Sequence, residues 1–129
     1  MNNNIPSNID SLPVYNVHNT IPKNFTGVCK VGIIGDNHYK VCWMNKGKLD
    51  RLDGPAVVYS DGSETWYKDG KIHRLTGPAH INYALNSQKK VVEIKCYYVE
   101  GKQYDAWMFW RHHLVQIAKL EHILRVLDC

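Results

Sequence analysis

The chain has 129 residues and a formal net charge of +4, and 44% of its residues are hydrophobic while 22% are charged. These values exclude disordered and collagen-like chains and predict a single domain covering residues 1–129. Lysine and arginine are spread singly beside aspartate or glutamate, so the charge pattern makes nucleic-acid binding an unfavoured function.

Membrane and secretion signals are not found in the sequence. No apolar run approaches the roughly 18 residues that cross a bilayer, and the N-terminus has neither the basic nor the apolar region of a signal peptide. We therefore expect a cytoplasmic protein without membrane contact. The four cysteines have no CxxC spacing and are expected to be reduced thiols. If the chain bends near Gly35, a disulfide between Cys29 and Cys42 is the alternative.

Residues 1–24 are predicted to form an asparagine-rich arm that lies across a sheet, and residues 25–104 are predicted to form that sheet. The sheet region repeats itself. The stretch from Trp43, "WMNKGKLDRLDGPAVVYS", aligns without a gap with the stretch from Trp66, "WYKDGKIHRLTGPAHINY". A degraded copy, "YYVEGKQYD", begins at Tyr97. A fixed period of this length indicates a stack of supersecondary units.

Each repeat contains the signals of an antiparallel hairpin. Asp61-Gly62 and Asp69-Gly70 lie between short runs rich in Val, Tyr, Trp and Thr, and Asp-Gly favours a two-residue turn. In the Gly-Pro corners the glycine permits the bend and the proline opens the next strand. We expect a meander with two strands per repeat and strands at 55–60, 63–68, 71–74 and 78–85.

Substitutions between the two copies distinguish the faces of these strands. Ala56 and Val58 correspond to Ala79 and Ile81, so this phase stays apolar and is expected to face the core. The other phase becomes polar and is expected to face water or a partner; its members are Val57, Tyr59, His80 and Asn82.

The wording "WYKDGKIHRxxG", together with the "DGS" turn, resembles the MORN repeat over roughly residues 41–104. The "NGKxHRxDGPA" form is similar to a branch that occurs in bacterial, phage and large-virus proteins, including a MORN-like antitoxin component. Asp50, Thr76 and the missing Gly-Pro corner of the third copy depart from it. The resemblance implies a non-catalytic β array used for protein or lipid contact, in the host cytoplasm if the protein is viral.

Residues 105–128 are predicted to form one long C-terminal helix, with Asp105 as its N-cap. The stripe expected to pack on the sheet comprises Ala106, Trp110, Leu114, Ile117, Leu120, Leu124 and Leu127. The opposite side carries Met108, His112, Val115, Lys119, His122, Ile123 and Val126. It is either part of a wide core stripe or a second contact face for a twin chain or a foreign protein.

Catalytic and metal-binding patterns are lacking. There is no HExxH or CxxC motif, no nucleophile elbow and no phosphate loop, and the aspartates mostly lie at turns. His112 and His113 are adjacent, so on one continuous helix they would point about 100° apart. We expect no catalytic residues, no metal and no cofactor.

Arg51 and Arg74 recur at the same position of the repeat while their neighbours change. Each arginine either stacks on a repeat tryptophan or pairs with a turn aspartate as a structural brace, or helps to bind an anionic ligand such as a phosphate or nucleotide. The candidate binding residues are Arg51, Arg74, Trp43, Trp66, Tyr67, His73, Tyr59 and His80.

The sequence therefore predicts an α+β, mainly β protein: an antiparallel hairpin meander with one long C-terminal helix. The predicted function is a non-catalytic protein-binding module, a phage or viral accessory protein that inhibits or modulates a host protein complex. The alternatives are an anion-sequestering protein and a structural or minor capsid subunit that forms homo-oligomers.

Overall fold

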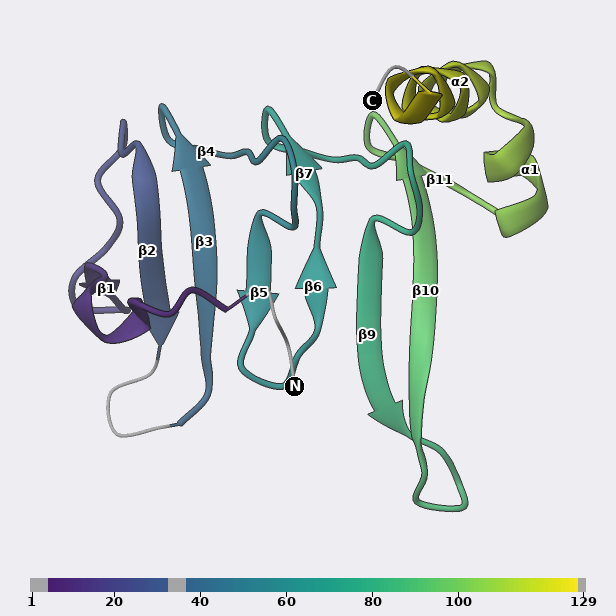
Figure 1. Ribbon diagram of the computed structural model, residues 1–129. Helices are drawn as coiled ribbons and strands as arrows, with labels where there is room; N and C mark the ends of the chain where they lie inside the picture. Colours follow the sequence, from purple (N-terminus) through teal and green to yellow (C-terminus); the bar gives the residue numbers. More distant parts are fainter. Residues whose placement is uncertain (1–4, 33–36, 128–129) are drawn as a thin grey trace.

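The computed structural model describes residues 5–32 and 37–127, and it is an α+β protein dominated by one antiparallel-rich sheet (Figure 1). Along the sheet the strands lie in the order β1-β2-β3-β5-β6-β9-β10-β11, with β4 paired to β3 and a separate hairpin β7-β8. The strands are β1 (Val14–Tyr15), β2 (Gly27–Gly32), β3 (Tyr39–Asn45), β4 (Lys48–Leu49), β5 (Val57–Tyr59), β6 (Glu64–Thr65), β7 (Tyr67–Lys68), β8 (Lys71–Ile72), β9 (His80–Leu85), β10 (Val91–Val99) and β11 (Lys102–Tyr104). The helices are the 3-10 turn η1 (Ile9–Ser11), α1 (Ala106–Arg111) and α2 (His113–Leu127).

The predicted antiparallel meander is confirmed: β3, β5, β6, β9 and β10 pair antiparallel one after another. The strands are shorter than expected, and the predicted strand 63–68 is divided at Trp66. There the amide of Trp66 donates to Ala79 in the main sheet, while its carbonyl accepts from His73 in the hairpin. One residue therefore joins the sheet to the β7-β8 hairpin.

Three hairpins repeat the same turn. Lys46-Gly47, Asp69-Gly70 and Glu100-Gly101 all have positive φ at both residues, as a two-residue type I′ turn requires. The amide of each turn glycine bonds to the preceding unit: Gly70 donates to Leu49 and Gly101 donates to Ile72, both at 2.8 Å. The degraded third copy thus keeps the stacking bond of the repeat.

The Asp61-Gly62 turn differs from the prediction. Only Gly62 has positive φ, and the bonds Tyr59 N–H to Ser63 O and Gly62 N–H to Tyr59 O enclose a loop of three residues. The Asp61 carboxylate accepts from the amide of Ser63. The residue count of this loop was therefore predicted wrongly, although the reversal occurs at the expected place. The proposed bend near Gly35 lies outside the described residues.

The sheet has buried side chains on both faces, which the face prediction did not anticipate. Ala56, Val58 and Ala79 are fully buried as expected, but Val57 is also only 2% exposed. Val57 packs with Cys29 and Cys42, which are register neighbours on β2 and β3. This cluster is covered in part by side chains of the N-terminal region: Tyr15, Ile21 and Phe25.

The N-terminal region is more than an arm, because β1 joins the sheet edge in parallel with β2. Before it, residues 5–8 and Leu12 lie beside Val28, Trp43 and Arg51.

Cys29 and Cys42 are free thiols, and a hydrogen bond between their side chains raises the pKa of Cys29 and lowers that of Cys42.

The predicted helix 105–128 is interrupted at His112, which has extended φ and ψ of −61° and 134°. The His112 amide donates to Phe109 at the end of α1, and His112 Nδ1 accepts from the amide of Leu114 at the start of α2. His112 therefore ends one helix and caps the next. Asp105 takes the N-cap position of α1, but its side chain makes no capping bond.

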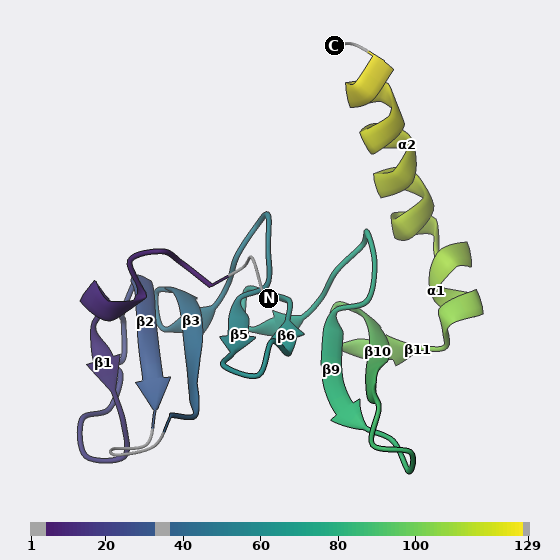
Figure 2. The same cartoon turned by 60° about the horizontal axis from the view of Figure 1, so that its bottom comes forward.

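Helix packing differs from the expected one. Val115, assigned to the outer face, is buried with Phe109 and Val99, whereas the stripe expected to pack on the sheet is exposed along α2 after Leu114, which packs partly against this cluster. Ile117, Leu120, Leu124 and Leu127 are 48%, 59%, 60% and 74% exposed. Figure 2 shows why: α2 projects away from the sheet and covers neither face. No helix among the described residues is long and apolar enough to span a membrane.

Candidate binding surfaces

Each repeat builds a stacked arginine–tryptophan pair. The guanidinium carbon of Arg51 lies 4.0 Å from the ring centroid of Trp43, and that of Arg74 lies 3.8 Å from the ring centroid of Trp66. Arg51 Nη1 donates to the carbonyl of Pro55 at 3.1 Å, and Arg74 Nη1 donates to that of Pro78 at 3.0 Å. Such stacking and donation join each corner loop to the segment that carries the tryptophan. This geometry agrees with the bracing interpretation.

The corner glycines recur for a reason other than the backbone bend predicted from the sequence. A Cβ atom on Gly54 would lie 2.5 Å from the guanidinium carbon of Arg51, and one on Gly77 would lie 3.2 Å from that of Arg74. Neither glycine has a positive φ. The repeat therefore needs glycine here for the space that the arginine occupies, and not for a special backbone conformation.

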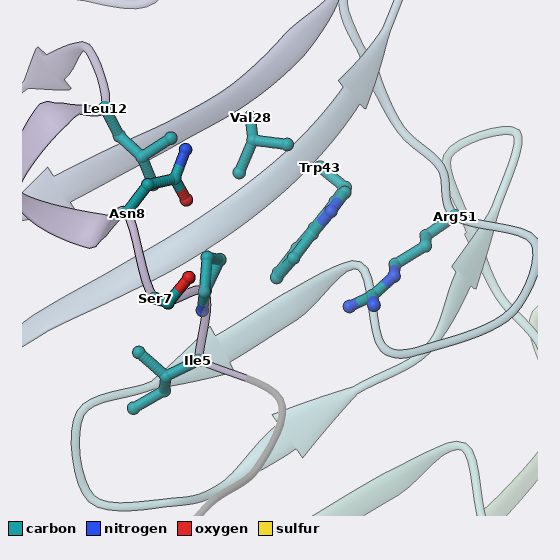
Figure 3. A pocket seen from close by; sticks show the side chains of 8 residues that line it. Ile5, Ser7, Asn8, Leu12, Val28, Trp43 and Arg51 are labelled. Atoms are coloured by element: carbon teal, nitrogen blue, oxygen red, sulfur yellow. The ribbon is translucent and has the colours of Figure 1, made fainter.

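The aromatic residue that begins each copy has different surroundings in the three copies. Figure 3 shows Trp43 and Arg51 facing N-terminal side chains such as Ile5 and Ser7 across a cavity of about 530 Å³. Tyr97, the equivalent residue of the third copy, packs under α1, with its ring centroid 4.8 Å from that of Phe109. Between these two copies, Trp66 lines an open cavity of its own.

That central cavity, of about 510 Å³, is lined by four basic side chains. Arg51 comes from the first corner loop, and Lys68, His73 and Arg74 come from the second repeat; Asp50, Leu52, Trp66, Leu75, Thr76 and Ala118 complete the wall. Burial lowers the pKa values of Arg51, Arg74 and His73, and nearby Lys68 lowers that of His73 further. His73 Nδ1 accepts from the amide of Glu100 at 2.9 Å, so that nitrogen is unprotonated in this arrangement.

Only some of the predicted binding residues meet at this cavity. Arg51, Trp66, His73 and Arg74 line it, whereas Trp43 lies at the neighbouring cavity. Tyr59 and Tyr67 instead pack against the Cys29–Cys42–Val57 cluster, where burial raises their pKa values. His80 Nδ1 lies 2.8 Å from Thr65 Oγ1, and Thr65 is the register neighbour of Val57.

Lys68 and Ala118 also line the cavity, although neither was predicted as a site residue. Lys68 is one residue before the Asp-Gly turn and its basic character was visible, but no local pattern placed it beside the corner loop of the preceding copy. Ala118 comes from α2, and only the position of that helix brings it to the cavity.

The residues predicted to form the helix interface do not all lie on the surface. Met108, Lys119, Ile123 and Val126 are exposed, His112 is half-buried, and Val115 belongs to the core. The exposed apolar stripe of α2 is defined here as Ile117, Leu120, Leu124 and Leu127, whose spacing of three and four residues is that of a coiled-coil seam.

Metal-binding groups are not seen in the described part of the chain: no set of three His, Cys, Asp or Glu side chains is suitably placed. His112 and His113 do not diverge as predicted, because the helix break at His112 stacks their rings with centroids 4.8 Å apart.

Comparisons with known proteins give no match, whether to family models, curated proteins or solved structures. The MORN resemblance therefore stays a prediction.

Proposed function

We propose that this protein is a non-catalytic protein-binding module whose main contact element is α2. The observation that carries the proposal is the exposure of the α2 stripe: every residue of 119–127 is exposed. Helices of about 12–15 residues are marginal in water without tertiary contacts. A partner that covers the stripe would therefore stabilise a helix that the domain itself supports only at its first turns.

The stripe favours a partner with an apolar groove or an amphipathic helix, which is the helix-in-groove mode of recognition. Its four side chains are about half to three-quarters exposed. Covering them would contribute on the order of 4–6 kcal/mol, since a fully buried Leu or Ile contributes about 1.5–3 kcal/mol. Association costs of about 4–15 kcal/mol oppose this gain, so further contacts beyond the stripe are needed for tight binding.

Site-specific photo-crosslinking tests this function. A photoreactive residue at Leu120 or Leu124 should give a discrete protein adduct in lysate of the source cells. The same residue at Val17, which is exposed in the N-terminal region far from α2 in sequence, should not. Adduct formation from the photoreactive residue at Leu120 should fall when Ile117 is replaced by Glu. Equal labelling from Leu120 and Val17 would reject α2 as the contact element.

Inhibition of a host complex by a viral or phage accessory protein, which the MORN resemblance implies, is the finer form of this proposal. If the crosslinked partner is an enzyme or a defence complex, its activity should fall on adding this protein. Addition of the Leu120→Glu variant should leave that activity unchanged.

A second candidate function is binding of a small anion, and the three cationic side chains at the Trp66 cavity, Arg51, Lys68 and Arg74, favour it. Thermal-shift measurements with inorganic phosphate and a nucleotide panel test it. An anion that binds only the folded state raises the melting temperature. The rise should shrink in Lys68→Ala and persist in Lys89→Ala, a variant outside the cavity. A flat response to the whole panel would reject this candidate.

A further inference from the structure

Strand β10 extends beyond the strand on its outer side. Residues 91–96 pair with β9 on one edge, but β11 covers only Tyr97–Val99 on the other. Among the described residues no strand pairs with the outer edge of Val91–Cys96, and Figure 1 shows this half of β10 bordering the sheet. A segment of this length without proline is a template for another strand.

The hydrogen-bonding groups on this edge can be assigned. The carbonyl of Cys96 accepts from the amide of Ala79 at 2.9 Å, so Cys96 directs its backbone groups toward β9. Because this direction alternates along a strand, Ile94 also faces β9, while Glu93 and Lys95 direct their N–H and C=O groups outward. Tyr97 and Val99, at the same phase, face the edge where β11 pairs.

The side chains on this edge have a self-complementary order. Glu93 and Lys95 lie on the same face, on either side of Ile94, with Lys95 Nζ 3.5 Å from a Glu93 carboxylate oxygen. If a second β10 runs antiparallel with Ile94 opposite Ile94, each Glu93 lies opposite a Lys95. The outward backbone groups of these residues then match as hydrogen-bonded pairs, with the Ile94 residues as the non-hydrogen-bonded pair between them.

We propose that two copies of this chain pair through the outer edges of β10, antiparallel and in the register centred on Ile94. The dimer joins the two sheets. Its ladder is limited to Val92–Cys96, because Tyr104 of β11 already occupies the position opposite Tyr97. The exposed side chains of Val92 and Ile94 gain cross-strand neighbours: Val92 faces Cys96, and Ile94 faces its own copy.

The order of Glu93 and Lys95 along β10 favours pairing with a second copy of the chain over pairing with an unrelated strand. A shift of the register by two residues along β10 sets Glu93 against Glu93 or Lys95 against Lys95, and like charges directly opposite each other are destabilising. The pairing is therefore specified by the chain's own sequence. It is independent of α2 and of the proposed partner, since it uses a different edge and different residues.

Mass measurements test the pairing. Sedimentation equilibrium of the full chain should show a dimer at concentrations of roughly 0.1–1 mM, because so short a ladder forms a small and weak interface. Glu93→Lys alone and Lys95→Glu alone should each reduce dimerisation at least tenfold. The double variant Glu93→Lys/Lys95→Glu should restore it, since the order of charges is again self-complementary. A monomer throughout this range, or a double variant no better than the single ones, would overturn the proposal.

Disulfide trapping tests the register itself. In a background with Cys96→Ser and Cys129→Ser, Ile94→Cys should form a covalent dimer on mild oxidation, because the two residues face each other within disulfide reach. Val91→Cys is the matched control: it is also exposed on β10, but its two copies would lie roughly 20 Å apart at about 3.4 Å per residue. Equal crosslinking of the two variants would overturn the register.

Self-association through α2 is distinguished by the variant Leu120→Glu/Leu124→Glu. It should leave both the dimer mass and the Ile94→Cys crosslink unchanged. Loss of the dimer in this variant, with no effect of Glu93→Lys, would assign the dimer to α2 and overturn pairing through β10.

Discussion

At the residue scale, the repeat depends on a tryptophan, an arginine and a glycine that support one another. The tryptophan ring supports the guanidinium, the guanidinium bonds a proline carbonyl, and the corner glycine leaves room for the arginine. This mutual dependence explains why glycine and arginine recur together in the two complete copies, while the residues around them change.

A double-mutant cycle in the first repeat measures this dependence. Arg51→Ala should lower the free energy of unfolding by about 1.5–3 kcal/mol, since it removes a cation–π contact and a hydrogen bond to a carbonyl. Gly54→Ala should cost a similar amount, because the new methyl group displaces the guanidinium. The double variant should cost little more than either single one. Urea denaturation provides the values, and simple additivity would contradict the unit.

The second repeat supplies the control for this cycle. Gly77→Ala should cost less than Gly54→Ala, because its Cβ would lie 3.2 Å rather than 2.5 Å from the guanidinium carbon. A larger loss at Gly77 would show that something other than the arginine limits these corners.

His73 should make stability depend on pH. Burial lowers its pKa below the ordinary value of 6.5, so the unfolded chain binds a proton more readily than the folded one. The contribution of His73 to stability should therefore be full above pH 6.5 and be lost as the pH falls through the lowered pKa of the folded state. His73→Asn keeps an acceptor for the Glu100 amide and should flatten this decline. His18→Asn, at an exposed position, should behave like the unchanged protein in pH-dependent denaturation.

At the element scale, the break at His112 decides which side of α2 meets the domain. A continuous helix would have kept one stripe inward along its length. The extended residue re-aims the chain, so Val115 enters the core beside Phe109 and Val99, while the longer stripe faces outward. The domain therefore holds α2 by its beginning.

Paired substitutions in α2 check this division. Val115→Ala should cost about 1.5–3 kcal/mol of unfolding free energy, because a buried side chain leaves a cavity. Leu120→Ala should stay within about 0.5 kcal/mol, as is usual for exposed positions. If thermal and urea denaturation ranked the two in the opposite order, α2 would have to lie against the sheet by its stripe.

At the scale of the whole molecule, two buried clusters lie at opposite parts of the sheet. One is built from Cys29, Cys42 and Val57, and the other from Val99, Phe109 and Val115. The repeats between them are joined by turn-to-strand bonds of neighbouring copies. Stacked units of this kind are stabilised mainly by nearest neighbours.

Phe109→Ala should therefore loosen one end of the molecule selectively. Hydrogen exchange should accelerate in β10, β11 and the helices, while the amides of β2 and β3 keep their protection, because they belong to the other cluster. A uniform loss of protection across all strands would show that the domain opens only as a single cooperative unit.

The amino-acid sequence by itself determined the features that depend on neighbouring residues. The hairpin at Asp69-Gly70, the corner prolines and the recurrence of Arg51 and Arg74 follow from local backbone chemistry and from comparison of the copies. Part of the candidate site followed as well, since Arg51, Arg74, Trp66 and His73 do line one cavity.

The tertiary structure alone decided which surfaces are covered. Val57 is buried because N-terminal side chains reach its cluster, and Ile117 is exposed because a single extended residue turns α2 away from the sheet. Likewise, the outer edge of Val91–Cys96 has no pairing strand within residues 5–32 and 37–127 because β11 stops at Tyr104. Burial and pairing depend on which distant segment arrives at a surface, and periodicity within one element carries no information about that arrival.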